Sequence, residues 1–89
     1  MEDSVDVTTH ELLRRMREQI RGKTWRVVQA GDAARSMGIE PGYPEYERRM
    51  AELVGAGYLV PDPNPAKLSS GYYEITDEGI VAADNPNEA

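Results

Sequence analysis

The sequence predicts an α+β fold in which three helices pack against a small antiparallel sheet. Hydrophobic residues recur at helical spacing in the first part of the chain, and short β-branched and aromatic runs replace them in the last third. Eighty-nine residues, of which 39% are hydrophobic, are enough for one small hydrophobic core. We therefore expect one domain of residues 8–84, between disordered tails of residues 1–7 and 85–89.

The first helix is expected to begin at Thr8, because Thr8 and Glu11 have the spacing of a capping box. Its apolar residues fall within an arc of about 100°, the width of a stripe that faces a core. These residues are Leu12, Leu13, Met16 and Ile20. Gly22 is expected to close the helix in a left-handed conformation. The β-branched and aromatic run of residues 24–28 then predicts a short strand, with Trp25 in the core.

Two further helices are expected after this strand. Asp32 is expected to cap a short helix of residues 33–37, which Gly38 ends. Pro44 suits the first position of a third helix, because the amide proton that proline lacks would have no partner there. One side of this third helix carries apolar residues at helical spacing, namely Tyr46, Met50, Leu53 and Val54. Tyr43, in the turn before the helix, is the best candidate for an exposed aromatic contact.

The last third of the chain predicts a β-hairpin followed by a short helix. Residues 58–60 and 72–76 are strand-like, and the eleven residues between them hold three prolines and a Ser-Ser-Gly turn. We expect this connection, residues 61–71, to be a stiff surface loop. Thr76 or Asp77 is expected to cap the closing helix.

This order of elements resembles that of the winged helix family. Residues 33–39 look like the first helix and turn of a helix-turn-helix, and residues 50–59 look like the end of a recognition helix that runs into the first wing strand. Residues 72–79 are similar to the second wing strand and cap of MarR- and PadR-like regulators. The resemblance implies a winged helix fold and sequence-specific DNA binding in transcriptional control. The turn before the third helix is longer than in the family pattern, and Lys67 is the only cation of the wing.

The resemblance places the DNA-binding surface on the third helix and the wing. Its candidate residues are Arg48 and Arg49 for bases or phosphates, Arg35 and Lys67 for phosphates, Glu45 or Glu47 for base discrimination, and Tyr43 as an exposed contact. Helical phase turns Arg48 and Arg49 away from the buried side. The alternative is a solvated helix with i,i+4 ion pairs, Glu45 with Arg49 and Arg48 with Glu52. A DNA-binding form is expected to be a homodimer that pairs through its first or last helix, because one domain reads one short half-site.

The charge distribution keeps a second class of function open, a winged helix that binds a protein partner. The net charge is −6, but the acidic tails carry most of it, so the body of the domain is nearly neutral. A domain that attracts nucleic acid has a basic surface. DNA binding is favoured if the arginines of the first helix fold onto the face that carries Arg48 and Lys67. Protein binding is favoured if Glu45, Glu47 and Glu52 dominate that face.

The first helix carries its own row of cations. They are Arg14, Arg17 and Arg21, with Lys23 and Arg26 close behind in sequence. Such a row is able to contact phosphates. Glu11 and Glu18 stand three or four residues from several arginines of the helix, so ion pairs on an ordinary solvated face are the favoured interpretation.

The sequence argues against catalysis, metal binding and membrane insertion. His10 is the single histidine and cysteine is absent, so neither an imidazole cluster nor a thiolate zinc site is expected. No stretch is apolar enough to cross a membrane, and no secretory signal is recognised. So short a chain is expected to lack a substrate pocket of ordinary size, about 300–1,000 Å³, which argues against a small-molecule sensor. We expect a cytoplasmic, non-enzymatic protein without a cofactor.

Overall fold

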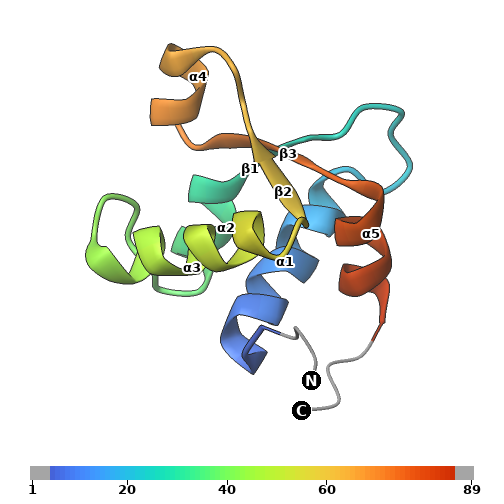
Figure 1. The fold of residues 1–89 in the computed structure, drawn as a ribbon, viewed down its shortest axis with the longest axis horizontal. Coiled ribbons are helices and arrows are strands. Elements are labelled where there is room, and N and C mark those ends of the chain that lie inside the picture. The colour runs from blue at the N-terminus through green and yellow to red at the C-terminus, as the bar shows by residue number, and fades with distance from the viewer. Residues whose placement is uncertain (1–4, 86–89) are drawn as a thin grey trace.

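The computed structural model describes residues 5–85 and shows an α+β fold, as predicted. Its elements are α1 (Val7–Gln19), β1 (Val27–Gln29), α2 (Ala30–Ser36), α3 (Pro44–Gly55), β2 (Leu59–Pro61), α4 (Pro65–Ser69), β3 (Tyr72–Ile75) and α5 (Asp77–Asp84). Figure 1 shows α3 and α5 on opposite sides of α1, with α4 projecting beyond the sheet. The outer parts of the expected disordered tails, residues 1–4 and 86–89, lie outside the described residues.

The sheet is antiparallel and has the strand order β1-β3-β2. The predicted hairpin is confirmed, because β2 and β3 pair with Leu59 opposite Ile75. The side chains of Val28, Leu59 and Ile75 are each about 1% exposed, so one face of the sheet belongs to the core. Val27 and Val60 flank Glu74 on the other face and are exposed. The sheet therefore has one buried and one solvated face, as is common for antiparallel sheets.

The core is built around α1, which packs against α2, α3, α5 and β1. The predicted apolar stripe of α1 is confirmed, since Leu12, Leu13 and Met16 are fully buried. On α3, Tyr46, Met50 and Leu53 are buried, and Val54 is partly buried, as their spacing predicts. None of the helices within residues 5–85 is long and apolar enough to cross a membrane.

Two helices begin earlier than predicted, because residues upstream of the expected caps accept the hydrogen bonds of their first turns. Asp6 caps α1 by accepting a 2.8 Å hydrogen bond from the N–H of Thr9, so Thr8 is not the cap. The Gln29 side chain caps α2 by accepting from N–H groups of its first turn, so Asp32 is not the cap either. Asp6 therefore belongs to the folded domain and not to a tail.

The environment predicted for Trp25 is wrong. Its side chain is 56% exposed, in the segment before β1, and the Lys23 ammonium lies 5.5 Å from the centre of its ring. Strand β1 begins only at Val27, two residues after Trp25, so the alternation of the strand does not turn the indole inward. The aromatic part of the core comes from Tyr46 instead.

The connection between β2 and β3 contains a helix, so its prediction as a loop is wrong. Asn64 caps α4 by accepting a 2.9 Å hydrogen bond from the N–H of Ala66, and Pro65 takes the first helical position. The chain then turns at Gly71, whose φ is +95°. A Cβ at Gly71 would lie 2.7 Å from Oε1 of Gln29. Both the positive φ and this close approach therefore require glycine.

Three local predictions near the remaining helix ends are confirmed. Pro44 is the first residue of α3, and Tyr43 before it is 65% exposed. Thr76 caps α5 by accepting a 3.0 Å hydrogen bond from the N–H of Gly79. The closing helix, predicted as short, extends for eight residues.

Candidate functional site

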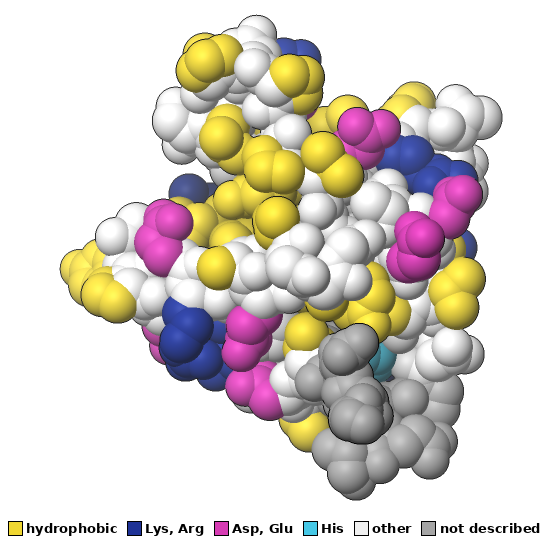
Figure 2. All heavy atoms as spheres, viewed as in Figure 1, with side chains coloured by type: hydrophobic (Ala, Val, Ile, Leu, Met, Phe, Trp, Pro, Cys, Tyr) yellow, Lys and Arg dark blue, Asp and Glu magenta, His cyan; other side chains and the backbone are white. Residues whose placement is uncertain are grey.

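A groove separates α3 from α4, and Figure 2 shows hydrophobic side chains gathered in the hollow between them. Its larger part has a volume of about 540 Å³, and a smaller part of about 230 Å³ continues beside α3. We call both parts together the α3–α4 groove. Its principal lining residues are Tyr46, Glu47, Met50, Val54, Leu68 and Tyr73. The larger volume is that of an ordinary ligand pocket, so the expectation that so short a chain lacks one is wrong.

Three elements position the lining residues. Glu47, Met50 and Val54 follow one another at spacings of three and four, so they share one side of α3. Leu68 reaches the groove from α4, and Tyr73 reaches it from β3, the central strand. The groove therefore depends on the fold of the β2–β3 connection as a helix.

Two tyrosines line this groove whose hydroxyls have no hydrogen-bond partner among residues 5–85. Tyr46 is only 6% exposed, and within residues 5–85 no group hydrogen-bonds the hydroxyl of Tyr46 or Tyr73. Burial raises the pKa of Tyr46 to about 12; ionised Tyr73 and the charge of Glu47 add to this effect, and the charge of Arg35 opposes it. Burial also raises the pKa of Tyr73, and Glu47 contributes again. Both phenols are therefore protonated at neutral pH and lie within Coulombic reach of Glu47.

Glu47 differs from the other acidic residues of α3. Glu45 forms an ion pair with Arg49 at 3.1 Å, and Glu52 accepts a 2.6 Å hydrogen bond from the hydroxyl of Thr9. No ion pair or hydrogen bond to the Glu47 carboxylate occurs within the described part of the chain. The carboxylate of Glu47 at the edge of the groove therefore has no ion-pair partner among residues 5–85.

The structure shows that Arg49 is not a surface residue, so its predicted orientation is wrong. Its side chain is 10% exposed. Nη1 donates to both carboxylate oxygens of Asp6 at 3.0 Å and to the Thr9 hydroxyl at 2.8 Å. Nε donates to Glu45 at 3.1 Å, so the alternative i,i+4 pair is confirmed. Arg49 lies at the margin of the buried stripe of α3, where the start of α1 covers it.

The other predicted site residues are exposed but scattered. The Arg48 side chain is 56% exposed and lies 3.9 Å from Glu52. Arg35 lines the larger part of the groove, and its guanidinium binds Asp32 at 3.0 Å. Lys67 is exposed on α4. With Tyr43 and Glu45, these residues surround α3 without forming a basic patch.

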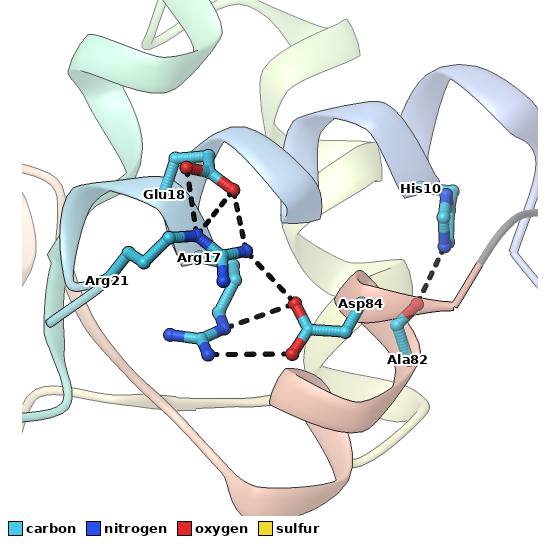
Figure 3. Close-up of polar contacts among 6 residues, drawn as sticks. All are labelled: His10, Arg17, Glu18, Arg21, Ala82 and Asp84. Carbon is cyan, nitrogen blue, oxygen red and sulfur yellow. Dashed lines mark hydrogen bonds and ion pairs between the residues drawn. The ribbon is translucent and has the colours of Figure 1, made fainter.

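The cations of α1 pair within their own helix and with α5. The predicted pairs of Glu11 with Arg14 and Arg15, and of Glu18 with Arg21, are present. Figure 3 shows Arg17 and Arg21 directed at Asp84 of α5, both at 3.3 Å. These hydrogen bonds hold the pKa of Asp84 below its ordinary value, with Arg17 as the main cause. Arg17 and Arg21 therefore join α1 to α5, on the side of α1 away from α3.

His10 also contributes to the contact between α1 and α5. It lies in the first turns of α1, as expected, and its Nε2 is 2.8 Å from the carbonyl oxygen of Ala82 (Figure 3). Only about 9% of the residue is exposed. Within residues 5–85, no three acidic or histidine side chains are grouped to hold a metal ion.

Comparison with known proteins gives no match, whether with family models, curated proteins or solved structures. The functional interpretation therefore depends on the geometry of the chain itself. Sequence reasoning assigned Tyr46 and Val54 to the core and missed the groove beside them. One local signal was available for α4, since Asn64 followed by Pro65 is a favourable helix start.

Proposed function

We propose that the chain is a winged helix domain whose α3–α4 groove binds a protein partner. Support for the winged helix comes from the order of its elements. Helix, strand and two helices precede a hairpin, and strand β3 of the hairpin pairs with β1, which gives the strand order β1-β3-β2. In this proposal α3 takes the place of the recognition helix, and α4 forms part of the wing.

The observation that carries the proposal is the chemistry of the surface between α3 and α4. In a DNA complex of a winged helix, the third helix enters the major groove, and phosphates lie beside it toward the wing. Phosphate binding requires lysine or arginine there. This chain places Leu68, Tyr73 and Glu47 at that position, and Glu47 has no ion-pair partner within residues 5–85. The surface is unfavourable for phosphates and suits an apolar ligand.

The charges around α3 support the same conclusion. Glu47 is the acidic residue of α3 that lines the groove, and Arg35, the arginine that lines it, pairs with Asp32. Arg17 and Arg21 do not join this face, because Asp84 binds them. We therefore commit to one kind of partner, a short apolar protein segment that carries positive charge.

Selection from a library of random short peptides tests this function directly. The proposal predicts that the wild-type domain enriches related sequences, and that Leu68→Asp abolishes their binding in fluorescence anisotropy. Leu68 is partly exposed on α4, so the substitution leaves the core intact. Val81→Asp is the matched control, because Val81 is 60% exposed on α5, outside the groove. Failure to enrich any sequence, or equal binding by both variants, would overturn the proposal.

DNA binding is the second candidate function. It is favoured by one observation, the exposed Arg48 on α3 with Lys67 on α4, at positions that the winged helix resemblance assigns to DNA. Titration of labelled random duplex DNA at low and at physiological salt separates the two functions. Our proposal predicts no binding at either salt concentration. Binding that weakens steeply with salt and disappears in the Arg48→Ala, Lys67→Ala double variant would favour DNA.

A further inference from the structure

We infer that Glu47, Tyr46 and Tyr73 form a recognition point for a lysine or arginine side chain of the bound segment. This inference rests on the proposed function and identifies the residue of the partner that gives specificity. The three groups come from two elements, α3 and β3, and line the same hollow. Together they offer one carboxylate and two phenol oxygens as hydrogen-bond acceptors.

The buried hydroxyl of Tyr46 shows that the hollow is suited to a polar ligand group. Tyr46 is more than nine-tenths buried, yet its hydroxyl has no partner within residues 5–85. Buried polar groups in proteins nearly always find a hydrogen-bond partner. A ligand group that enters the hollow beside Tyr73 would supply one.

The charge of Glu47 selects a cationic group. Within the described residues, it is the one acidic side chain of α3 without a protein donor. Ammonium and guanidinium groups carry several donors and no acceptor, so one such group can serve Glu47 and the phenol oxygens at once. Hydrogen bonds of this kind are strengthened by charge. The aromatic faces of the tyrosines add a further attraction for a cation.

The shape of the groove places an apolar residue next to this cation. Glu47, Leu68 and Tyr73 line both parts of the groove, so they stand at the junction between them. The smaller part, with Met50 and Val54, is apolar and suits one large aliphatic side chain. Arg35 lines the larger part together with Tyr46, and its charge is offset there by an ion pair with Asp32. The expected ligand motif is therefore a basic residue close in space to an aliphatic one.

The peptides selected by the wild-type domain test this inference. We expect them to share a lysine or arginine near an aliphatic residue. Glu47→Gln should weaken the binding of a labelled synthetic copy by about tenfold to a hundredfold, the effect of losing a charge-assisted hydrogen bond. Glu40→Gln is the matched control, because Glu40 is exposed in the turn before α3 and does not line the groove. We expect it to leave the affinity within about twofold.

Tyr46→Phe supplies a second readout that separates recognition from folding. It removes only the unpaired hydroxyl, so we expect unchanged or higher thermal stability together with weaker peptide binding. Enriched peptides without a basic residue would overturn the inference while leaving the binding function intact. Equal peptide affinities of the Glu47→Gln and Glu40→Gln variants would also overturn the inference and leave the binding function intact. If no peptide is enriched, the proposed function itself fails, and the inference fails with it.

Discussion

Replacing Arg49 by alanine should destabilise the domain, whereas the same change at Arg48 should not. Arg49 donates hydrogen bonds to Asp6, Thr9 and Glu45, and its side chain is 10% exposed. Breaking a fully buried ion pair costs about 3–5 kcal/mol. The Asp6 and Glu45 carboxylates are 52% and 48% exposed, so water can replace part of their lost bonds. We therefore expect Arg49→Ala to lower the free energy of unfolding by about 2 kcal/mol.

The neighbouring arginine provides the control for this measurement. The Arg48 side chain is 56% exposed and lies 3.9 Å from Glu52, so its loss should change the free energy of unfolding by less than about 0.5 kcal/mol. Circular dichroism melts of both variants give the comparison. For a domain of this size, 2 kcal/mol corresponds to a fall in Tm of about 8–16 °C. Equal Tm values for Arg48→Ala and Arg49→Ala would refute the buried position of Arg49.

The same network gives the stability a defined dependence on pH. The pKa of Asp6 lies below its ordinary value of 3.8, mainly because its carboxylate accepts a hydrogen bond from the N–H of Thr9. Hydrogen bonding to Arg49 lowers this pKa further. The folded state therefore favours the ionised carboxyl, and this stabilisation is present above pH 3.8. It is lost as the pH falls through the lowered pKa of Asp6. Urea denaturation between pH 6 and pH 2 should show that the free energy of unfolding falls less with acid in Asp6→Asn than in the wild type. An equal fall in both proteins would contradict this role of Asp6.

Three further predictions concern the packing of the domain and the α3–α4 groove. Gly79→Ala should lower the free energy of unfolding by about 1–3 kcal/mol in urea denaturation, because a Cβ at Gly79 would overlap the carbonyl of Tyr58. Gly55→Ala, whose Cβ meets no atom within 4 Å, should not destabilise, and equal losses in both variants would contradict this packing. Trp25→Ser should change the free energy of unfolding by less than about 0.5 kcal/mol, since the indole is 56% exposed; a loss above 2 kcal/mol would restore the sequence-based placement in the core. Asn64→Ala should weaken peptide binding by loosening α4 at nearly constant Tm, and unchanged affinity would show that the cap of α4 is not needed for the groove.

The sequence was sufficient where local pattern decides the structure. The stripe of Leu12 and Met16 on α1 is a property of helical spacing, and it predicts the buried face without knowledge of what covers it. Pro44 and Thr76 act within one turn of their own helices, so their positions also follow from the sequence. The hairpin followed from two strand-like runs around a turn-rich connection.

The sequence was insufficient where distant segments decide the environment of a residue. Arg48 and Arg49 are identical neighbours, but Arg49 lies at the margin of the buried stripe of α3, where the start of α1 covers it. The groove could not be predicted either, because it needs Leu68 and Tyr73 beside α3. Glu47 itself was visible in the sequence, but its lack of an ion-pair partner among residues 5–85 was not.

Amide chemical-shift mapping tests the central claim, that the α3–α4 groove is the binding surface. The isotope-labelled full chain would be titrated first with the selected peptide and then, separately, with random duplex DNA. We predict that the peptide shifts the amide signals of Glu47, Met50, Leu68 and Tyr73 at low concentration, and that DNA leaves them unchanged. The claim would be contradicted if the peptide shifts concentrated on α5, or if DNA alone shifted the signals of α3 in a salt-dependent way.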